Sequence, residues 1–96
     1  MATKIIWSDK ARDDLDGIFL YLSDFSEDYA MQWSNKVFED IESLEIFPEM
    51  GRIVPEKEVT FLREILVWKY RILYTFLNHD ITIVRILHSS MSIRKI

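Results

Sequence analysis

Three arginines interrupt an otherwise apolar stretch, FLREILVWKYRILYTFLNHDITIVRILH, which covers residues 61–88. They are Arg63, Arg71 and Arg85, and His88 closes the same stretch. A guanidinium group holds phosphate or carboxylate, and a histidine near neutral pH can take or give a proton. These residues could therefore bind phosphate or an acidic protein surface, and His88 could act as a general base.

Burial limits what the arginines can do, because a cation in an apolar interior is costly unless it is paired. The three guanidinium groups must lie on an exposed sheet face, at an edge, or against a carboxylate such as Glu64. Target contact and pairing with Glu64 are equally compatible with Arg71 and Arg85. His88 could be a general base or a hydrogen-bonded structural histidine. Arg52 could be a surface contact or a donor to loop carbonyls.

The stretch that carries the arginines is predicted to form three consecutive β-strands, at residues 61–67, 70–77 and 81–88. Trp68-Lys69 reads as a tight turn, and Asn78-His79-Asp80 supplies residues that accept turn geometry. Such short connections require antiparallel neighbours. We expect the arginines on the face of this sheet that no helix covers.

The N-terminal half supplies the elements that should cover the other face. Residues 3–7 predict a short strand beside the later sheet. Apolar spacing predicts helices at about residues 9–22 and 26–46, capped by Ser8 and Ser26. Their three-residue link makes them an antiparallel hairpin. The order β-α-α-β-β-β predicts an α+β fold, with a helical hairpin packed on one face of a mostly antiparallel sheet.

A chain of 96 residues predicts a single domain over residues 1–96, with one modest core. Within it we expect the hairpin at about 9–46, a loop at 47–60, the sheet at 61–88 and a tail at 89–96. Gly51, in the loop, is expected at a turn position with positive φ. Gly17 lies inside the first helix and is expected to allow close approach of a neighbour.

Composition excludes several classes of protein. There is no cysteine, so neither a disulfide framework nor a cysteine–metal site can form. His79 and Asp80 are too few for a metal site, so we predict no metal and no cofactor. No apolar run reaches about 18 residues, and the N-terminus is charged where a signal peptide is apolar. We expect a cytoplasmic protein that does not enter a membrane.

The net charge of −4 is unevenly distributed. Residues 1–49 hold four Lys/Arg against twelve Asp/Glu, whereas residues 50–96 hold eight against four. The basic half could meet phosphate or an acidic protein surface. A dedicated nucleic-acid binder is usually basic overall, so the balance argues against tight non-specific binding of RNA or DNA.

A set of short motifs runs through the chain and is moderately specific in combination. It comprises Ala11-x-x-Asp14-Leu15, Ala30-x-x-Trp33, Phe47-Pro48-x-x-Gly51-Arg52-x-Val54-Pro55-Glu56, Arg63-Glu64, Tyr70-Arg71-Ile72-x-Tyr74 and Arg85-x-Leu87-His88. Over essentially the whole chain these motifs resemble the ParE/RelE family of toxins from bacterial type II toxin–antitoxin systems. The resemblance implies the same arrangement of a hairpin on a sheet.

The resemblance implies two alternative targets. RelE-like members cut mRNA in the ribosomal A site, and in that case Arg63, Arg71 and His88 would be catalytic. ParE-like members inhibit DNA gyrase. Met91 stands roughly where RelE-like members have an arginine, and His88-x-x-Met91 resembles the end of some ParE-like members, although Ser92 stands where many have Asp. The loop and the acidic balance also favour the ParE-like branch.

On this basis we expect a gyrase inhibitor without assigned catalytic residues, silenced by a cognate antitoxin in a hetero-oligomer. The antitoxin tail should lie as a helix or strand in an apolar groove beside the hairpin and sheet. Trp68, an aromatic residue in a turn, is a candidate antitoxin contact. The alternatives are a ribosome-dependent mRNA endonuclease and a non-toxic module that only binds an antitoxin. The residues predicted to bind the target are Arg52, Arg63, Arg71, Arg85 and His88.

Overall fold

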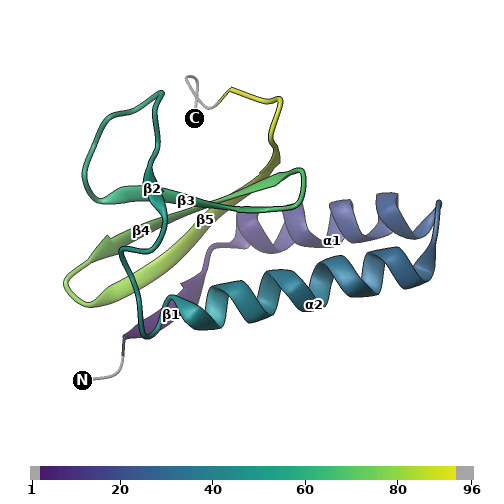
Figure 1. The fold of residues 1–96 in the computed structure, drawn as a ribbon, viewed down its shortest axis with the longest axis horizontal. Helices are drawn as coiled ribbons and strands as arrows, with labels where there is room; N and C mark the ends of the chain where they lie inside the picture. Colours follow the sequence, from purple (N-terminus) through teal and green to yellow (C-terminus); the bar gives the residue numbers. More distant parts are fainter. Residues whose placement is uncertain (1–2, 93–96) are drawn as a thin grey trace.

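The computed structural model describes residues 3–92, in which two helices cover one face of a five-stranded mixed sheet (Figure 1). The strand order across the sheet is β1-β5-β4-β3-β2, with β1 parallel to β5 and the other neighbours antiparallel. The α+β fold is confirmed. The elements are β1 (Lys4–Trp7), α1 (Asp9–Ser23), α2 (Glu27–Ser43), β2 (Arg52–Ile53), β3 (Leu62–Val67), β4 (Tyr70–Leu77) and β5 (Asp80–His88).

The structure departs from the sequence-based boundaries in two places. The two-residue strand β2 lies inside the segment expected to be a loop, and it pairs with β3. Helix α2 ends at Ser43 rather than near residue 46, and the chain continues in turns, with the Phe47 N–H donating to the Ser43 carbonyl at 2.9 Å. Pro48 is incompatible with a longer helix. The end of the expected tail, residues 93–96, lies outside the described part.

Both expected helix caps are present. Ser8 accepts a hydrogen bond from the Ala11 N–H at 3.0 Å, and Ser26 accepts one from the Tyr29 N–H at 3.2 Å. The Ser8 hydroxyl also donates to the Val84 carbonyl at 2.9 Å. One side chain therefore begins α1 and ties that helix to β5 just beyond the end of β1.

The core lies between the helices and the sheet. Trp33, Val37 and Leu44 from the α2 segment are fully buried against isoleucines of β4 and β5. Trp33 is thus a core residue and not part of an exposed groove. The turn between β4 and β5 uses Asn78 and His79, both with positive φ, as a two-residue type I′ turn requires.

Both glycines behave differently from expectation. Gly51 does not have a positive φ. It is required by close approach, since a Cβ atom there would lie 2.6 Å from the Glu64 carbonyl oxygen and 2.7 Å from the Tyr74 hydroxyl. Gly17, by contrast, has no neighbour within 4 Å of the position that a Cβ atom would take, so the expected close contact at that glycine is wrong.

Replacing Gly17 with Ala is expected to stabilise the fold by about 1 kcal/mol, because glycine costs roughly that much in a helix interior. For a domain of this size the thermal midpoint should rise by about 4–8 °C. The matched change Gly51→Ala should lower it, because the added carbon collides with backbone. A lowered midpoint for Gly17→Ala would contradict the open surroundings of that glycine.

Candidate functional site

A chain of four charged side chains occupies the sheet face away from the helices. Glu64 of β3 is 1% exposed and lies between two arginines. Its carboxylate accepts from Arg52 Nε at 2.6 Å and from Arg71 Nε at 2.7 Å. Arg71 also donates to both carboxylate oxygens of Glu56, at 2.7 and 2.8 Å. The alternating charges compensate one another, which is what burial demands.

Other parts of the chain close over this network. The Met91 carbonyl accepts a hydrogen bond from Arg71 Nη1 at 2.9 Å, and Val54 is buried against Leu73 and Leu87. Figure 1 shows the segment between β2 and β3 and the segment after β5 on the side of the sheet opposite the helices. Hydrogen bonds to Glu56 and then Glu64 raise the pKa of Arg71 above its usual value, against the effect of burial. Arg71 is therefore a buried, permanently charged group.

Arg85 belongs to the edge of β5 that β1 leaves uncovered. Its guanidinium group donates to the Asp14 carboxylate of α1 at 2.8 Å, which raises the pKa of Arg85. The same carboxylate accepts the Ile86 N–H at 2.9 Å. Asp14 therefore satisfies both the arginine and the backbone of a strand edge without a neighbouring strand.

Arg63 and Tyr74 hold the loop that follows α2. Arg63 donates to the Gly51 carbonyl at 2.8 Å and lies 3.3 Å from the Glu49 carboxylate. The Tyr74 hydroxyl accepts the Gly51 N–H at 3.0 Å and donates to the Pro48 carbonyl at 2.7 Å. Burial raises the pKa of Tyr74, so the neutral hydroxyl and its stabilising contribution persist below about pH 10 and are lost as pH rises further.

The expectation of three arginines on one exposed face is therefore wrong. Arg71 lies in the buried network, Arg85 at the β5 edge against α1, and Arg63 at the loop after α2. Each is paired with a carboxylate, since the cost of leaving a cation unpaired in these partly buried positions is high. Arg52 is also paired, yet 62% of its side chain remains exposed.

His88 lies on the helix-facing side of the sheet, opposite the side that holds Arg71. It pairs with Tyr70 across β4 and β5, and the two rings meet edge to face at 5.5 Å. Its Nδ1 accepts the Ser90 N–H at 3.1 Å and lies 2.7 Å from the Ser90 hydroxyl. These contacts match the structural role considered for this histidine, and they keep it apart from Arg71.

Figure 1 shows that the helical hairpin extends past the end of the sheet. Exposed aromatic side chains gather at that end. We call this group the tip surface, and it consists of Tyr21, Phe25, Tyr29 and Trp68. A cavity of about 540 Å³ opens there, with Lys69 and His88 among its lining residues. Trp68 is exposed, as expected, and its ring contacts Tyr29 at 5.1 Å. Its φ of 57° is strained for a bulky side chain.

Sequence reasoning assigned no role to the large apolar residues Ile46, Phe47 and Met50, which the structure exposes beside the network. The available signal was their position next to Pro48 and Gly51, where a loop would not bury them.

In the part that the structure describes, no helix is long and apolar enough to cross a bilayer. Within residues 3–92, no three histidine or carboxylate side chains gather as a metal site.

Comparisons with known proteins identify a family from the sequence and similar folds among solved structures. Residues 5–93 match the family described as ParE toxin of type II toxin–antitoxin system, parDE. The chain is similar to a structure of a chromosomal ParDE system from P. aeruginosa, with a TM-score of 0.73 and 23% identity over 91% of this chain and 96% of that one. The chain is also similar to the RelBE2 toxin–antitoxin complex from Mycobacterium tuberculosis, with a TM-score of 0.61 and 19% identity over 92% of this chain and 99% of that one. No curated protein sequence matches significantly.

Replacing Glu64 with Gln should destabilise the fold, because two arginines lose their shared carboxylate. Breaking a buried pair costs roughly 3–5 kcal/mol, and we expect the lower end, since Arg71 keeps Glu56 and Arg52 reaches solvent. Urea unfolding measures the change. Asp40→Asn, which breaks the exposed pair with Lys36, is the control and should have little effect. Equal effects of the two changes would contradict a structural role for the network.

Proposed function

The chain belongs to the family of ParE toxins of type II toxin–antitoxin systems, and from this premise we propose that it inhibits DNA gyrase and is silenced by a cognate antitoxin. In this proposal it acts in the cytoplasm, binds gyrase without cutting a substrate, and forms a hetero-oligomer with the antitoxin. Arg52, with its largely exposed side chain, is retained as a candidate target contact. We propose structural roles in place of target binding for Arg63, Arg71, Arg85 and His88, because their side chains are engaged within the chain.

The separation of the nuclease candidates carries this proposal. Metal-independent RNA cleavage needs a base, an acid and cations around one phosphate. Arg71 and His88 lie on opposite faces of the sheet. Arg63 is opposite Tyr74 on β4, and His88 is opposite Tyr70 on the same strand. Four residues of β4, or about 13 Å, therefore separate Arg63 from His88 along the sheet. With Arg71 also bound by two carboxylates, this arrangement favours inhibition by binding over the RelE-like alternative.

The tip surface is the best candidate for the antitoxin. Its exposed aromatic side chains and its cavity of about 540 Å³ offer the kind of apolar groove that takes a helix or strand of a partner. Trp68 is kept exposed at a strained backbone position, which favours a functional role over a folding role. Aromatic residues of this type commonly dominate binding energy.

The central test uses two assays on one preparation of the purified chain. We expect the protein to block supercoiling of relaxed plasmid by gyrase and to leave mRNA on ribosomes intact. A matched His88→Ala variant should inhibit as strongly as the wild type, because the histidine ring packs on Tyr70 and bonds to Ser90, and the tip-surface cavity that it lines is assigned to the antitoxin and not to gyrase.

Cleavage of ribosome-bound mRNA with unaffected supercoiling would refute the proposal. If His88→Ala then stopped cleavage, the RelE-like alternative would stand. A wild-type protein inactive in both assays, but still bound by its antitoxin, would indicate a non-toxic antitoxin-binding module.

Replacing Trp68 with Gly should weaken antitoxin binding by about thirtyfold, the effect of removing an aromatic hot spot. Glycine accepts the positive φ of this turn, so the fold should be retained. Calorimetric titration with the antitoxin and circular dichroism measure the two effects. Met31→Ser, which removes another half-exposed apolar side chain from α2, is the control and should bind normally. Unchanged affinity for Trp68→Gly would remove this turn from the antitoxin site.

A further inference from the structure

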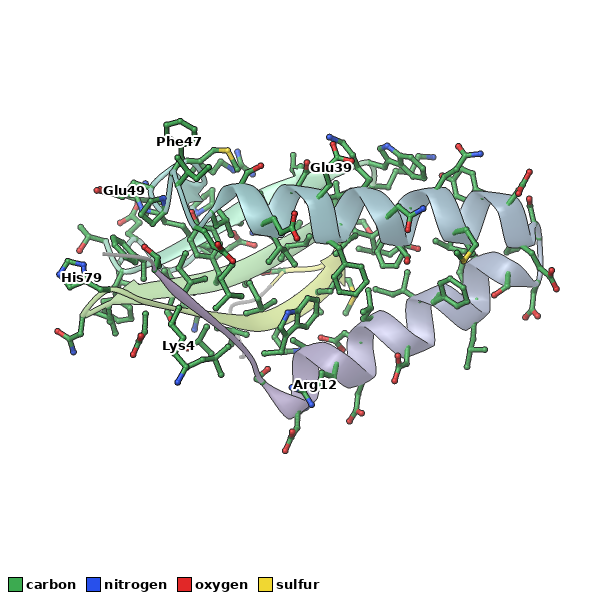
Figure 2. The ribbon with its side chains drawn as sticks, turned by 90° about the horizontal axis from the view of Figure 1, so that it is seen from below. Lys4, Arg12, Glu39, Phe47, Glu49 and His79 are labelled. Atoms are coloured by element: carbon green, nitrogen blue, oxygen red, sulfur yellow. The ribbon has the colours of Figure 1, made fainter. Side chains whose placement is uncertain are left out.

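A second exposed apolar surface lies at the end of α2 opposite the tip surface. Ile46, Phe47 and Met50 are 73%, 62% and 48% exposed. Together with Pro48 and Glu49 they line a cavity of about 540 Å³. Figure 2 shows the Phe47 side chain directed away from the body of the molecule. We call residues 46–50 the loop surface.

The loop surface is held in place by groups of the sheet beneath it. The Tyr74 hydroxyl bonds to both Gly51 and Pro48, and Arg63 donates to the Gly51 carbonyl. The apolar side chains are therefore presented on a fixed backbone. A partner that binds such a loop loses little free energy to ordering it, which favours a role in recognition.

Carboxylates surround the apolar centre. Glu42 and Glu45 are exposed at the end of α2, and Glu49 keeps 70% of its side chain exposed although it lies 3.3 Å from Arg63. Arg63 is bound to Glu49 and only 17% exposed, whereas Arg52, which lies beside Met50 and is bound to Glu64, keeps 62% of its side chain exposed. The surface is thus apolar at its centre and acidic at its rim, and it complements a partner of the opposite charge.

We propose that the loop surface contacts the target of this toxin, a protein surface with an apolar patch bordered by lysine and arginine side chains. An arginine of the partner would lay its aliphatic stem on Phe47 and Met50 and direct its guanidinium group to Glu49. The inference rests on the proposed function, because an enzyme that acts on DNA carries cationic surfaces to hold phosphates.

The double variant Ile46→Ser/Phe47→Ser tests the apolar centre. Both side chains are mostly exposed, so the unfolding midpoint and the antitoxin affinity should match the wild type. The concentration needed to inhibit supercoiling should rise by roughly tenfold or more. Leu20→Ser removes a similarly exposed apolar side chain from α1 and should inhibit normally.

The variant Glu42→Lys/Glu45→Lys tests the acidic rim. Its inhibition should be weaker than that of the wild type, most clearly at low salt, with the difference narrowing as ionic strength rises. A charge reversal with no effect at any salt concentration would overturn the proposed charge complementarity.

The outcomes separate this inference from the proposed function. Full inhibition by Ile46→Ser/Phe47→Ser, with an active wild type, overturns the loop surface as the contact and leaves gyrase inhibition standing. A tenfold loss of antitoxin affinity in that variant, with inhibition intact, also overturns it and assigns the loop to the antitoxin. A wild-type protein without effect on supercoiling overturns both proposals.

Discussion

The buried carboxylate of Glu64 sets the arrangement of one side of the sheet. It sits directly opposite Arg52 of β2 and within hydrogen-bond distance of Arg71 of β4, so cations from both neighbouring strands meet it. A slip of one residue in β3 would move this carboxylate to the helix-facing side, into the apolar core. The Glu64 carboxylate therefore stabilises the three strands and also fixes their register, because only one register brings it to Arg52 and Arg71.

The same network determines which residues remain available for binding. Through Arg71 it fastens Glu56 and the Met91 carbonyl over the face away from the helices. Asp14 and Glu49 likewise occupy Arg85 and Arg63. With these arginines engaged inside the molecule, the surface features left for recognition are chiefly apolar. Two of them, the tip surface and the loop surface, lie at the two ends of α2, where the helical hairpin passes the sheet and where the chain returns to it.

Local chemistry was readable from the sequence, and pairing between distant residues was not. Ser8 and Ser26 gave the helix starts, and Asn78 with His79 gave the turn, because each acts on neighbouring backbone. Pairing of Arg71 with Glu64, seven residues away, was one of the alternatives considered from the sequence, and the structure contains it. The other partners of Arg52, Arg71 and Arg85 lie 12, 15 and 71 residues away, and only the fold brings them together. Gly51 shows the same limit, since its requirement comes from Tyr74 and Glu64 and not from its own φ.

The length of α2 constrains how one partner could cover both surfaces. The helix has 17 residues, so the tip surface and the loop surface lie about 25 Å apart. An antitoxin segment that reaches from Tyr29 to Phe47 needs about 17 residues as a helix or about eight as an extended strand. A shorter segment seated at the tip surface leaves the loop surface accessible. Neutralisation would then require the bulk of the antitoxin, not its docked segment, to keep the target away from Phe47.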